Sequence, residues 1–197
     1  MCTTAFRHIS HMNRPLAFDP DVALDRAMHL FWERGYEGTS LQDLLRATHL
    51  SKSSLYQTFG SKHALLLEAI RRYRDEISSR MDADLAAASS GRAFIEDVFS
   101  EFAESGCFVL NCASEFAQRD REVAELVSCG LARFEAIFEA AVRRAQQEGE
   151  IDHGRDAKAL ARYLVSSRSG LKTMAKAGAS PRTMKDIVDA VLRTLFG

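Results

Sequence analysis

The chain has 197 residues, of which 46% are hydrophobic and 27% are charged, and its net charge is −1. This length allows one sizeable core or two small ones, and the composition is ordinary for a soluble globular protein. No apolar run approaches the roughly 18 residues of a transmembrane helix and no signal segment begins the chain, so we expect a cytoplasmic protein without a membrane partner.

The first elements are a tail and a helix. Residues 1–17 have no hydrophobic periodicity, and we interpret them as a flexible tail. Asp19 followed by Pro20 predicts a helix start, because a capping side chain and a proline at the first helical position both suit a helix N-terminus. Gly35 predicts the end of this helix.

Two short helices follow. Ser40 and Asp43 stand three residues apart, which is the pattern of a capping box, and they begin a helix of about two turns. Ser51 predicts the cap of the next helix, with Leu50 and Leu55 at the positions of a hydrophobic staple. Helices this short are not stable alone, so both must pack on other elements.

The second short helix has an outward face without acidic residues. All of its outward side chains can form hydrogen bonds: Lys52, Ser53, Ser54, Tyr56, Gln57 and Thr58. Such a face suits phosphate oxygens and base edges. Two short helices around a tight turn predict a helix-turn-helix whose second helix enters the major groove of double-stranded DNA.

Residues beside this pair extend the predicted DNA-binding set. Thr39 and Ser40 precede the first short helix, although Thr39 could equally serve only as a cap. Gly60 ends the second helix and Ser61 caps the next one, so Lys62 lies at a helix N-terminus, where free amides favour a phosphate. We expect Lys62 and Tyr56 to be exposed beside one another.

The charge distribution agrees with this location. Residues 1–74 hold ten Lys and Arg against seven Asp and Glu, a balance of +3, whereas the remainder has a balance of −4. A DNA-binding protein concentrates positive charge where it meets the phosphates.

Residues 20–66 resemble the N-terminal DNA-binding domain of TetR-type transcriptional regulators. The shared elements are Leu30-Phe31, Gly35-Tyr36, Thr39-Ser40, Ser51-Lys52, Leu55-Tyr56, Phe59, Ser61-Lys62 and Leu65. One departure is His49, which stands in the turn where the family usually has glycine. A histidine can adopt positive φ at some cost, so we expect a slightly strained turn.

The remaining chain also has helical periodicity, with predicted breaks at residues 89–91, 106, 149 and 178. We count about nine helices and no strand pattern, which predicts an all-α fold. We assign residues 18–66 to a helix-turn-helix domain and residues 67–197 to an effector-sensing and dimerisation domain.

The last two helices are the predicted dimer surface. Small residues there would permit close approach of helices: Ser166, Ser167, Ser169 and Gly170. The resemblance implies that these helices pair as a four-helix bundle in a homodimer, which a two-fold operator also requires. Alternatively, the same helices simply close the core of the monomer.

The resemblance also implies that a small molecule controls DNA binding through the second domain. Residues 105–117 resemble a subgroup of repressors that respond to electrophiles such as N-ethylmaleimide, and a cysteine at a predicted helix start is a candidate sensor. The candidate effector or redox site comprises Phe102, Cys107, Phe108, Asn111 and Phe134. Each of these residues could instead be an ordinary packing residue.

These patterns favour a dimeric repressor released from a palindromic operator by a small molecule or by cysteine modification. An activator of the same family and a helical adaptor without DNA binding are the alternatives. The chain lacks a phosphate-binding glycine loop, a nucleophile elbow and a metal-ligand spacing. We therefore expect no enzymatic activity, no cofactor and no metal.

Overall fold

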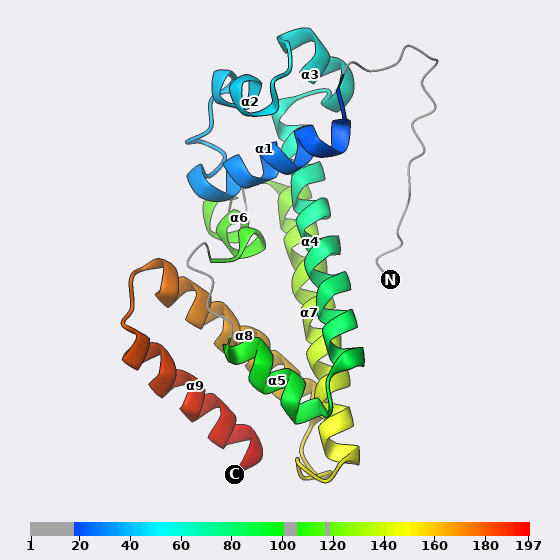
Figure 1. Ribbon diagram of the computed structural model, residues 1–197, viewed down its shortest axis with the longest axis vertical. Coiled ribbons are helices and arrows are strands. Elements are labelled where there is room, and N and C mark those ends of the chain that lie inside the picture. Colours follow the sequence, from blue (N-terminus) through cyan, green and yellow to red (C-terminus); the bar gives the residue numbers. More distant parts are fainter. Residues whose placement is uncertain (1–17, 101–105, 117–118) are drawn as a thin grey trace. The chain divides into compact units, whose positions relative to one another are not determined.

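A computed structural model describes residues 18–100, 106–116 and 119–197. Within these ranges the chain forms nine helices and no strand, which confirms the predicted all-α fold (Figure 1). The helices form two compact units, of which the first ends at Ala69 and the second begins at Ile70. The domain boundary predicted after residue 66 stays a prediction, since the division falls inside one continuous helix. The predicted tail, residues 1–17, lies outside the described residues.

The first unit contains α1 (Pro20–Arg34), α2 (Leu41–Thr48), α3 (Lys52–Phe59) and the beginning of α4 (Lys62–Ala87). The predicted boundaries of α1 are confirmed, since the Asp19 side chain accepts a hydrogen bond from the Asp21 amide and Gly35 ends the helix with φ 73°. The Ser61 hydroxyl likewise accepts from the Ala64 amide at the start of α4, at 2.9 Å.

The predicted capping box of α2 is present. The Ser40 hydroxyl accepts from the Asp43 amide at 3.1 Å, and the Asp43 carboxylate accepts from the Ser40 amide at 3.0 Å. Hydrogen bonds from the Ser40 hydroxyl and amide, and then from Arg46, lower the pKa of Asp43 to about 2. The carboxylate is therefore ionised near neutral pH, where its charge suits the helix N-terminus.

The turn between α2 and α3 contains a left-handed residue at the position where the resemblance to the family led us to expect a strained turn. His49 has φ 57° and ψ 25°, and it is the one residue other than glycine with positive φ in the described part of the chain. Thr48 supports the turn, because its hydroxyl donates to the Leu44 carbonyl at 2.7 Å and accepts from the Leu50 amide at 3.4 Å.

One small core holds the first unit together. Leu44 of α2, Leu55 of α3 and Leu65 of α4 have no exposed surface, and Phe31 of α1 is almost fully buried. Because α2 and α3 turn apolar side chains into this core, most of their polar side chains face solvent, Thr48 excepted.

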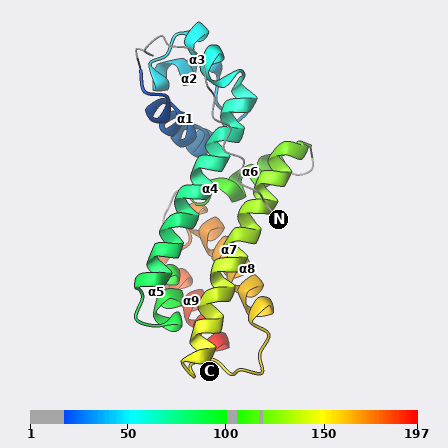
Figure 2. The ribbon, with the colours of Figure 1, turned by 90° about the vertical axis from the view of Figure 1, so that its right-hand side faces the viewer.

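The second unit contains the rest of α4, α5 (Gly91–Ser100), α6 (Phe108–Phe116), α7 (Arg121–Gln147), α8 (Ala157–Lys176) and α9 (Pro181–Phe196). Helices α5, α6 and α8 pack on α7, and α9 packs on α8 and α5. Figures 1 and 2 show α7 running beside the second-unit part of α4, with α8 and α9 forming an antiparallel pair.

Phenylalanines form the centre of the second unit. Phe138 of α7 lies between Phe94 and Phe99 of α5, with ring centroids 6.2 and 6.3 Å apart, and all three rings are almost fully buried. These three aromatic residues therefore form core contacts between α5 and α7.

Arg144 of α7 binds the end of α4 and the two residues that follow it. Its guanidinium donates to the carbonyls of Leu85, Ala88 and Ser89 at 2.9 to 3.1 Å. These carbonyls lack partners within a helix, so the arginine replaces the solvent or the capping residue that would otherwise satisfy them.

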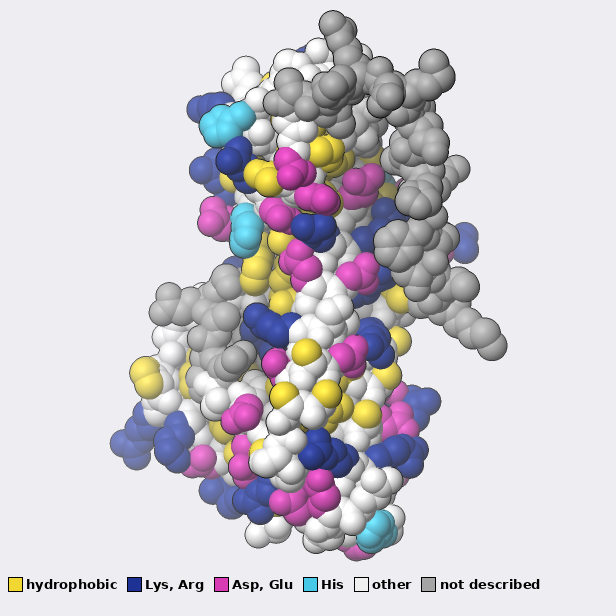
Figure 3. Space-filling model, turned by 45° about the vertical axis from the view of Figure 1, so that its right-hand side comes forward, with side chains coloured by type: hydrophobic (Ala, Val, Ile, Leu, Met, Phe, Trp, Pro, Cys, Tyr) yellow, Lys and Arg dark blue, Asp and Glu magenta, His cyan; other side chains and the backbone are white. Residues whose placement is uncertain are grey.

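The surface of the described helices is charged in both signs. Ion pairs four residues apart occur repeatedly along them, including Arg72–Glu76, Arg92–Glu96 and Lys185–Asp189. Figure 3 accordingly shows basic and acidic side chains interspersed on the second unit. Exposed pairs of this kind contribute little stability each. No helix in the described ranges combines the length and apolar character needed to cross a membrane.

The start of α5 provides a test of the packing in the second unit. A Cβ at Gly91 would contact the Ala141 carbonyl oxygen and lie 2.5 Å from the Ala145 amide nitrogen, and neither backbone atom can move alone. We expect Gly91→Ala to lower the free energy of unfolding by about 1–3 kcal/mol, the usual cost of overpacking, in urea titrations followed by circular dichroism.

Gly130→Ala in α7 is the matched control. A Cβ there would meet only side-chain atoms of Val109 and Arg74, at 3.5 to 3.7 Å. The control should leave stability unchanged or raise it by up to about 1 kcal/mol, since alanine favours a helix. Equal stability of the two variants would contradict the packing of α5 on α7.

Candidate nucleic-acid interface and effector pocket

The outward face of α3 is polar and lacks acidic residues. Lys52, Ser53, Tyr56 and Gln57 are exposed, and Tyr56 keeps 40% of its surface in solvent although it is aromatic. Ser54 and Thr58 of the predicted set are half-buried at the edges of this face. An α3 residue that projects from this face can reach a phosphate or a base edge.

The serines at the start of α3 form a small network. The Ser51 hydroxyl accepts from the Ser54 amide at 3.1 Å, and its oxygen lies 3.0 and 2.8 Å from the hydroxyls of Ser53 and Ser54. Ser51 therefore caps the helix as predicted. Since Ser53 and Ser54 are hydrogen-bonded to the cap, their orientations at the helix N-terminus are restricted before any ligand arrives.

Thr39 differs from the other residues of the predicted DNA-binding set. Its side chain is completely buried, and its hydroxyl donates to the Gly35 carbonyl at 2.6 Å. Ser40, the next residue, is exposed but takes part in the capping box of α2. In this structure Thr39 is a packing residue, and we leave it out of the proposed interface.

Lys62 is half-buried, so the expectation of an exposed side chain beside Tyr56 is wrong. Its ammonium group donates to the Tyr36 carbonyl at 2.7 Å and lies 4.0 Å from the centroid of the Tyr36 ring. The ring of Tyr36 in turn stacks on Phe31. Lys62 therefore ties the start of α4 to the loop after α1 through a charged hydrogen bond and a cation–π contact.

Sequence reasoning missed Arg46 of α2. Its side chain is 76% exposed and forms an ion pair with Asp43 at 2.5 Å. Because the guanidinium lies at the surface, Arg46 is a further candidate for a phosphate contact. The sequence did offer a signal for Arg46, because it is a basic residue in the last helical turn of α2, just before the loop that leads to α3.

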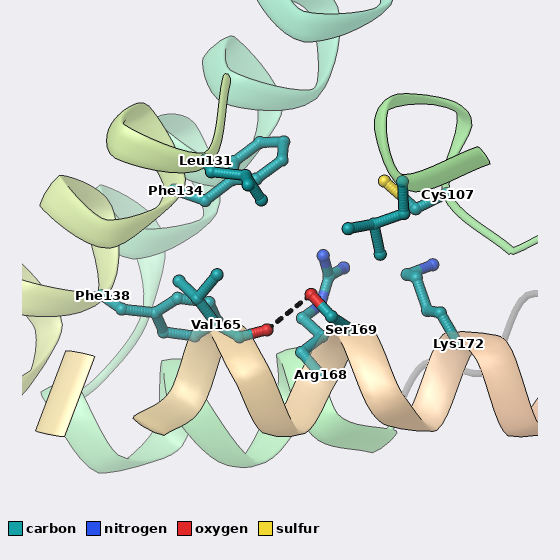
Figure 4. A pocket seen from close by; sticks show the side chains of 9 residues that line it. Cys107, Leu131, Phe134, Phe138, Val165, Arg168, Ser169 and Lys172 are labelled. Carbon is teal, nitrogen blue, oxygen red and sulfur yellow. Dashed lines mark hydrogen bonds between the residues drawn. The ribbon is translucent and has the colours of Figure 1, made fainter. Parts of the chain in front are cut away.

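A small cavity lies between α6, α7 and α8 of the second unit. Its volume is about 20 Å³, room for about one water molecule. The lining residues, most of which Figure 4 labels, are Cys107, Leu110, Leu131, Phe134, Phe138, Val165, Arg168, Ser169 and Lys172.

Two of the five predicted effector residues line this cavity, namely Cys107 and Phe134. Phe108 instead packs edge-on against Tyr73 with ring centroids 5.7 Å apart, and Asn111 is half-buried outside the lining. Phe102 lies outside the described residues. The two basic residues of the cavity, Arg168 and Lys172, were missed, although their spacing of four residues placed them on one face of a helix.

Cys107, just before α6, and Cys112, within α6, have different environments. Cys107 immediately precedes α6, borders the cavity and contacts the Tyr73 hydroxyl. Burial, and then the neighbouring Cys107, raise the pKa of Tyr73 above its usual range, so that the hydroxyl stays protonated. Burial raises the pKa of Cys112 to about 12, which makes this thiol a poor nucleophile.

The cavity adjoins a wider groove of about 650 Å³ between the same three helices. Leu110, Leu131, Val165 and Ser169 line both spaces. The groove is mostly apolar, and its size is that of a typical small-molecule site. No group of three or more His, Cys, Asp or Glu is placed to hold a metal ion in the ranges that the structure describes.

Two family models match the chain. Residues 23–69 match the model described as bacterial regulatory proteins, tetR family, and residues 88–191 match the model described as tetracyclin repressor-like, C-terminal domain. The first match covers α2 and α3, and the second covers the helices that form the cavity and the groove.

Two curated relatives, both named as HTH-type transcriptional regulators or repressors, match the chain over nearly its whole length. The chain is 35% identical to the uncharacterized HTH-type transcriptional regulator YezE of Bacillus subtilis, over 93% of this chain and 100% of YezE. It is 32% identical to the HTH-type transcriptional repressor ComR of Escherichia coli, over 91% and 90% of the two chains.

One solved structure is similar in both sequence and fold. It is a variant of the TetR family transcriptional regulator CifR with two cysteines substituted, in complex with a 26-base-pair operator DNA. The TM-score is 0.79 at 31% identity, and the match covers 91% of this chain and 98% of that chain.

The contact between Lys62 and Tyr36 can be tested by comparing two lysines in equivalent positions. Lys62 is the first residue of α4 and Lys52 is the first residue of α3, so each places the same charge at a helix N-terminus. We expect Lys62→Met to lower the free energy of unfolding by about 1–2 kcal/mol, because it removes a charged hydrogen bond and a cation–π contact.

Lys52→Met serves as the control and should change stability by no more than about 0.5 kcal/mol, as surface substitutions usually do. Urea titrations of both variants would measure the difference. A Lys62→Met variant as stable as the Lys52→Met variant would mean that the Tyr36 contact contributes nothing to the first unit.

Proposed function

The chain belongs to the TetR family of bacterial regulatory proteins, and we propose that it is a dimeric repressor that leaves a palindromic operator when a small molecule binds or a cysteine is modified. The chain is a DNA-binding transcriptional regulator by its family. The repressor role is proposed because ComR is named a repressor.

The observation that carries the DNA-binding mechanism is the outward face of α3. Lys52, Tyr56 and Gln57 project from a capped helix of eight residues whose opposite face is buried. We assign base reading to Lys52 and Gln57, since long polar side chains can form two hydrogen bonds with a base edge. We assign phosphate contacts to Tyr56, and Arg46 joins these as a further candidate.

A homodimer is supported by an open face of α8 and α9. A groove of about 550 Å³ runs between these helices, and its lining includes Tyr163 and Met174, two large side chains that are 36% and 38% exposed. Ser167 and Gly170 line this groove, whereas Ser166 and Ser169 line the groove beside α6. The four small residues therefore lie on two different faces of α8. Of these, Ser167 and Gly170 lie on the face where a second subunit could approach closely.

Control by a ligand is proposed for the cavity and groove between α6, α7 and α8. An effector must bind one conformation of the repressor better than the other, and binding there would do so by altering how these helices pack. Cys107 is the candidate for covalent control, because its thiol borders the cavity and the cavity adjoins the wider groove.

We further propose that the chain acts in the cytoplasm, where bacterial DNA lies, and that it catalyses no reaction. The family assignment supports both, since regulators of this kind act through binding alone. An activator role remains the runner-up, and a reporter gene placed behind the operator separates the two, because deleting the protein raises expression only for a repressor.

The division of labour on α3 predicts different defects for two variants. Gln57→Ala should lose about 1–3 kcal/mol of preference for one base pair in each half-site, because a base contact is removed. Tyr56→Phe removes one hydroxyl and should weaken binding to all operators alike, since phosphates carry no sequence information. Fluorescence anisotropy with a set of single-base operator variants measures both, and equal losses across that set for Gln57→Ala would contradict its assignment.

Selection of genomic DNA fragments by the purified protein tests the proposal as a whole. We expect enrichment of an inverted repeat, loss of binding after treatment with hydrogen peroxide, and recovery with dithiothreitol. Cys107→Ser should abolish the loss, whereas Cys112→Ser should keep it, because burial holds the Cys112 thiol protonated.

A repeat that is enriched but insensitive to oxidation would leave the regulator intact and point to a non-covalent ligand. Absence of any enriched fragment would contradict the proposed operator.

A further inference from the structure

Two arginines from different helices meet at one carboxylate in the first unit. A guanidinium nitrogen of Arg46 in α2 lies 2.5 Å from Oδ1 of Asp43, and one of Arg34, the last residue of α1, lies 3.5 Å from the same oxygen. The other carboxylate oxygen, Oδ2, accepts from the Ser40 amide at 3.0 Å and also from the Ser40 hydroxyl. Asp43 therefore holds the two guanidinium groups side by side where α1 meets α2.

This group of three side chains has an excess of positive charge. The Asp43 carboxylate is ionised near neutral pH, and its single negative charge offsets only one of the two guanidinium groups. The side chains of Arg34 and Arg46 are 54% and 76% exposed, whereas that of Asp43 is only 16% exposed. The charge that this group presents to solvent is therefore mainly positive.

The position of α2 indicates what this charge would meet. In a helix-turn-helix the second helix enters the major groove, while the first helix crosses the sugar-phosphate backbone. Here α2 is the first helix, and its exposed residues are Gln42 and Arg46, which lie four positions apart and so on one face. Arg46 is the single basic residue of α2, which places it for a phosphate and not for a base edge.

We propose that Arg34 and Arg46, held together by Asp43, bind one phosphate of the operator backbone as a pair. This inference rests on the proposed function, because it adds a shared contact to the DNA-binding surface of the regulator.

The two ion pairs with Asp43 persist in the proposed complex. Asp43 engages one nitrogen of each guanidinium, and a guanidinium carries five N–H donors, so a phosphate can be a second acceptor for both arginines. A phosphate in contact with the two guanidinium groups lies closer to them than to the carboxylate that they share. Because Coulomb energies fall with distance, attraction to the two positive charges exceeds repulsion by the negative one.

The shared carboxylate also favours a joint contact over two separate ones. Free arginine side chains lose much rotamer freedom when they bind a ligand, and Asp43 restrains both of them before DNA arrives. The alternative role is to hold α1 against α2, although exposed ion pairs contribute little to stability. The two roles differ in how salt affects DNA binding.

The salt dependence of DNA binding tests the pair. We would measure affinity of the full-length protein by fluorescence anisotropy, between about 50 and 200 mM potassium chloride, for the inverted repeat recovered by selection and for a mixed-sequence duplex of equal length. The slope of log affinity against log salt concentration counts the phosphates that are neutralised. A protein carrying both Arg34→Met and Arg46→Met should have a slope smaller by about 0.9 per subunit, since one phosphate contact is lost.

Single variants and a matched control locate the contact. Arg34→Met and Arg46→Met should each weaken binding by roughly three- to ten-fold, and equally on both duplexes, because phosphates carry no sequence information. Arg46→Lys keeps the charge and should keep the slope. Arg143→Met is the control, because Arg143 of the second unit is 61% exposed and pairs with Glu139 of its own helix at 2.6 Å. It removes the same charge and should leave the slope unchanged.

Three outcomes would overturn the proposal. A slope smaller by about 1.8 per subunit in the double variant would mean two separate phosphates, and an unchanged slope would mean that Asp43 and the arginines only hold α1 against α2. A reduced slope for Arg46→Lys would mean that charge is not the contact. Each single variant leaves one of the two ion pairs in place, so the single variants decide the matter if circular dichroism shows that the double variant is unfolded.

The two duplexes keep this inference apart from the proposed function. If no inverted repeat is recovered, the proposed operator is contradicted, while the arginine pair can still be measured on the mixed-sequence duplex. If a repeat is recovered and the double variant binds it with an unchanged slope, this inference alone is overturned.

Discussion

Two helices of eight residues each present the proposed DNA-reading surface, and neither is long enough to be stable by itself. Both depend on burying an apolar side chain in a shared core: Leu44 from α2 and Leu55 from α3 are completely enclosed. Burial fixes which side of each helix faces inward, and therefore which side chains of α3 face solvent. The proposed recognition surface is in this sense a consequence of the core beneath it.

Local polar contacts then restrict the geometry that the core permits. Serine caps begin α2, α3 and α4, and His49 has a left-handed conformation in the turn between α2 and α3. Lys62 adds a longer-range restraint by contacting the loop at Tyr36. Because these contacts exist without DNA, less conformational freedom would have to be lost when DNA binds.

The second unit combines a well-packed centre with open space at the proposed effector site. The rings of Phe94, Phe99 and Phe138 form a dense centre between α5 and α7. Beside it, α6 is only nine residues long and leaves a cavity and a groove against α7 and α8. Basic side chains at such a boundary keep their charged ends near water while their stems cover apolar surface.

The sequence by itself determined the helical elements, their caps and the outward face of α3, because capping and helical periodicity are local properties of residues at most four positions apart. The left-handed turn at His49 was expected from the resemblance to the family, which usually has glycine there. Only the tertiary structure decided that Thr39 is buried, that Lys62 contacts Tyr36, and that Arg168 and Lys172 share a cavity with Cys107. These outcomes depend on contacts between side chains that are distant in the sequence. Periodicity could not predict them, because it shows which face of a helix is polar but not which residues pack against that face.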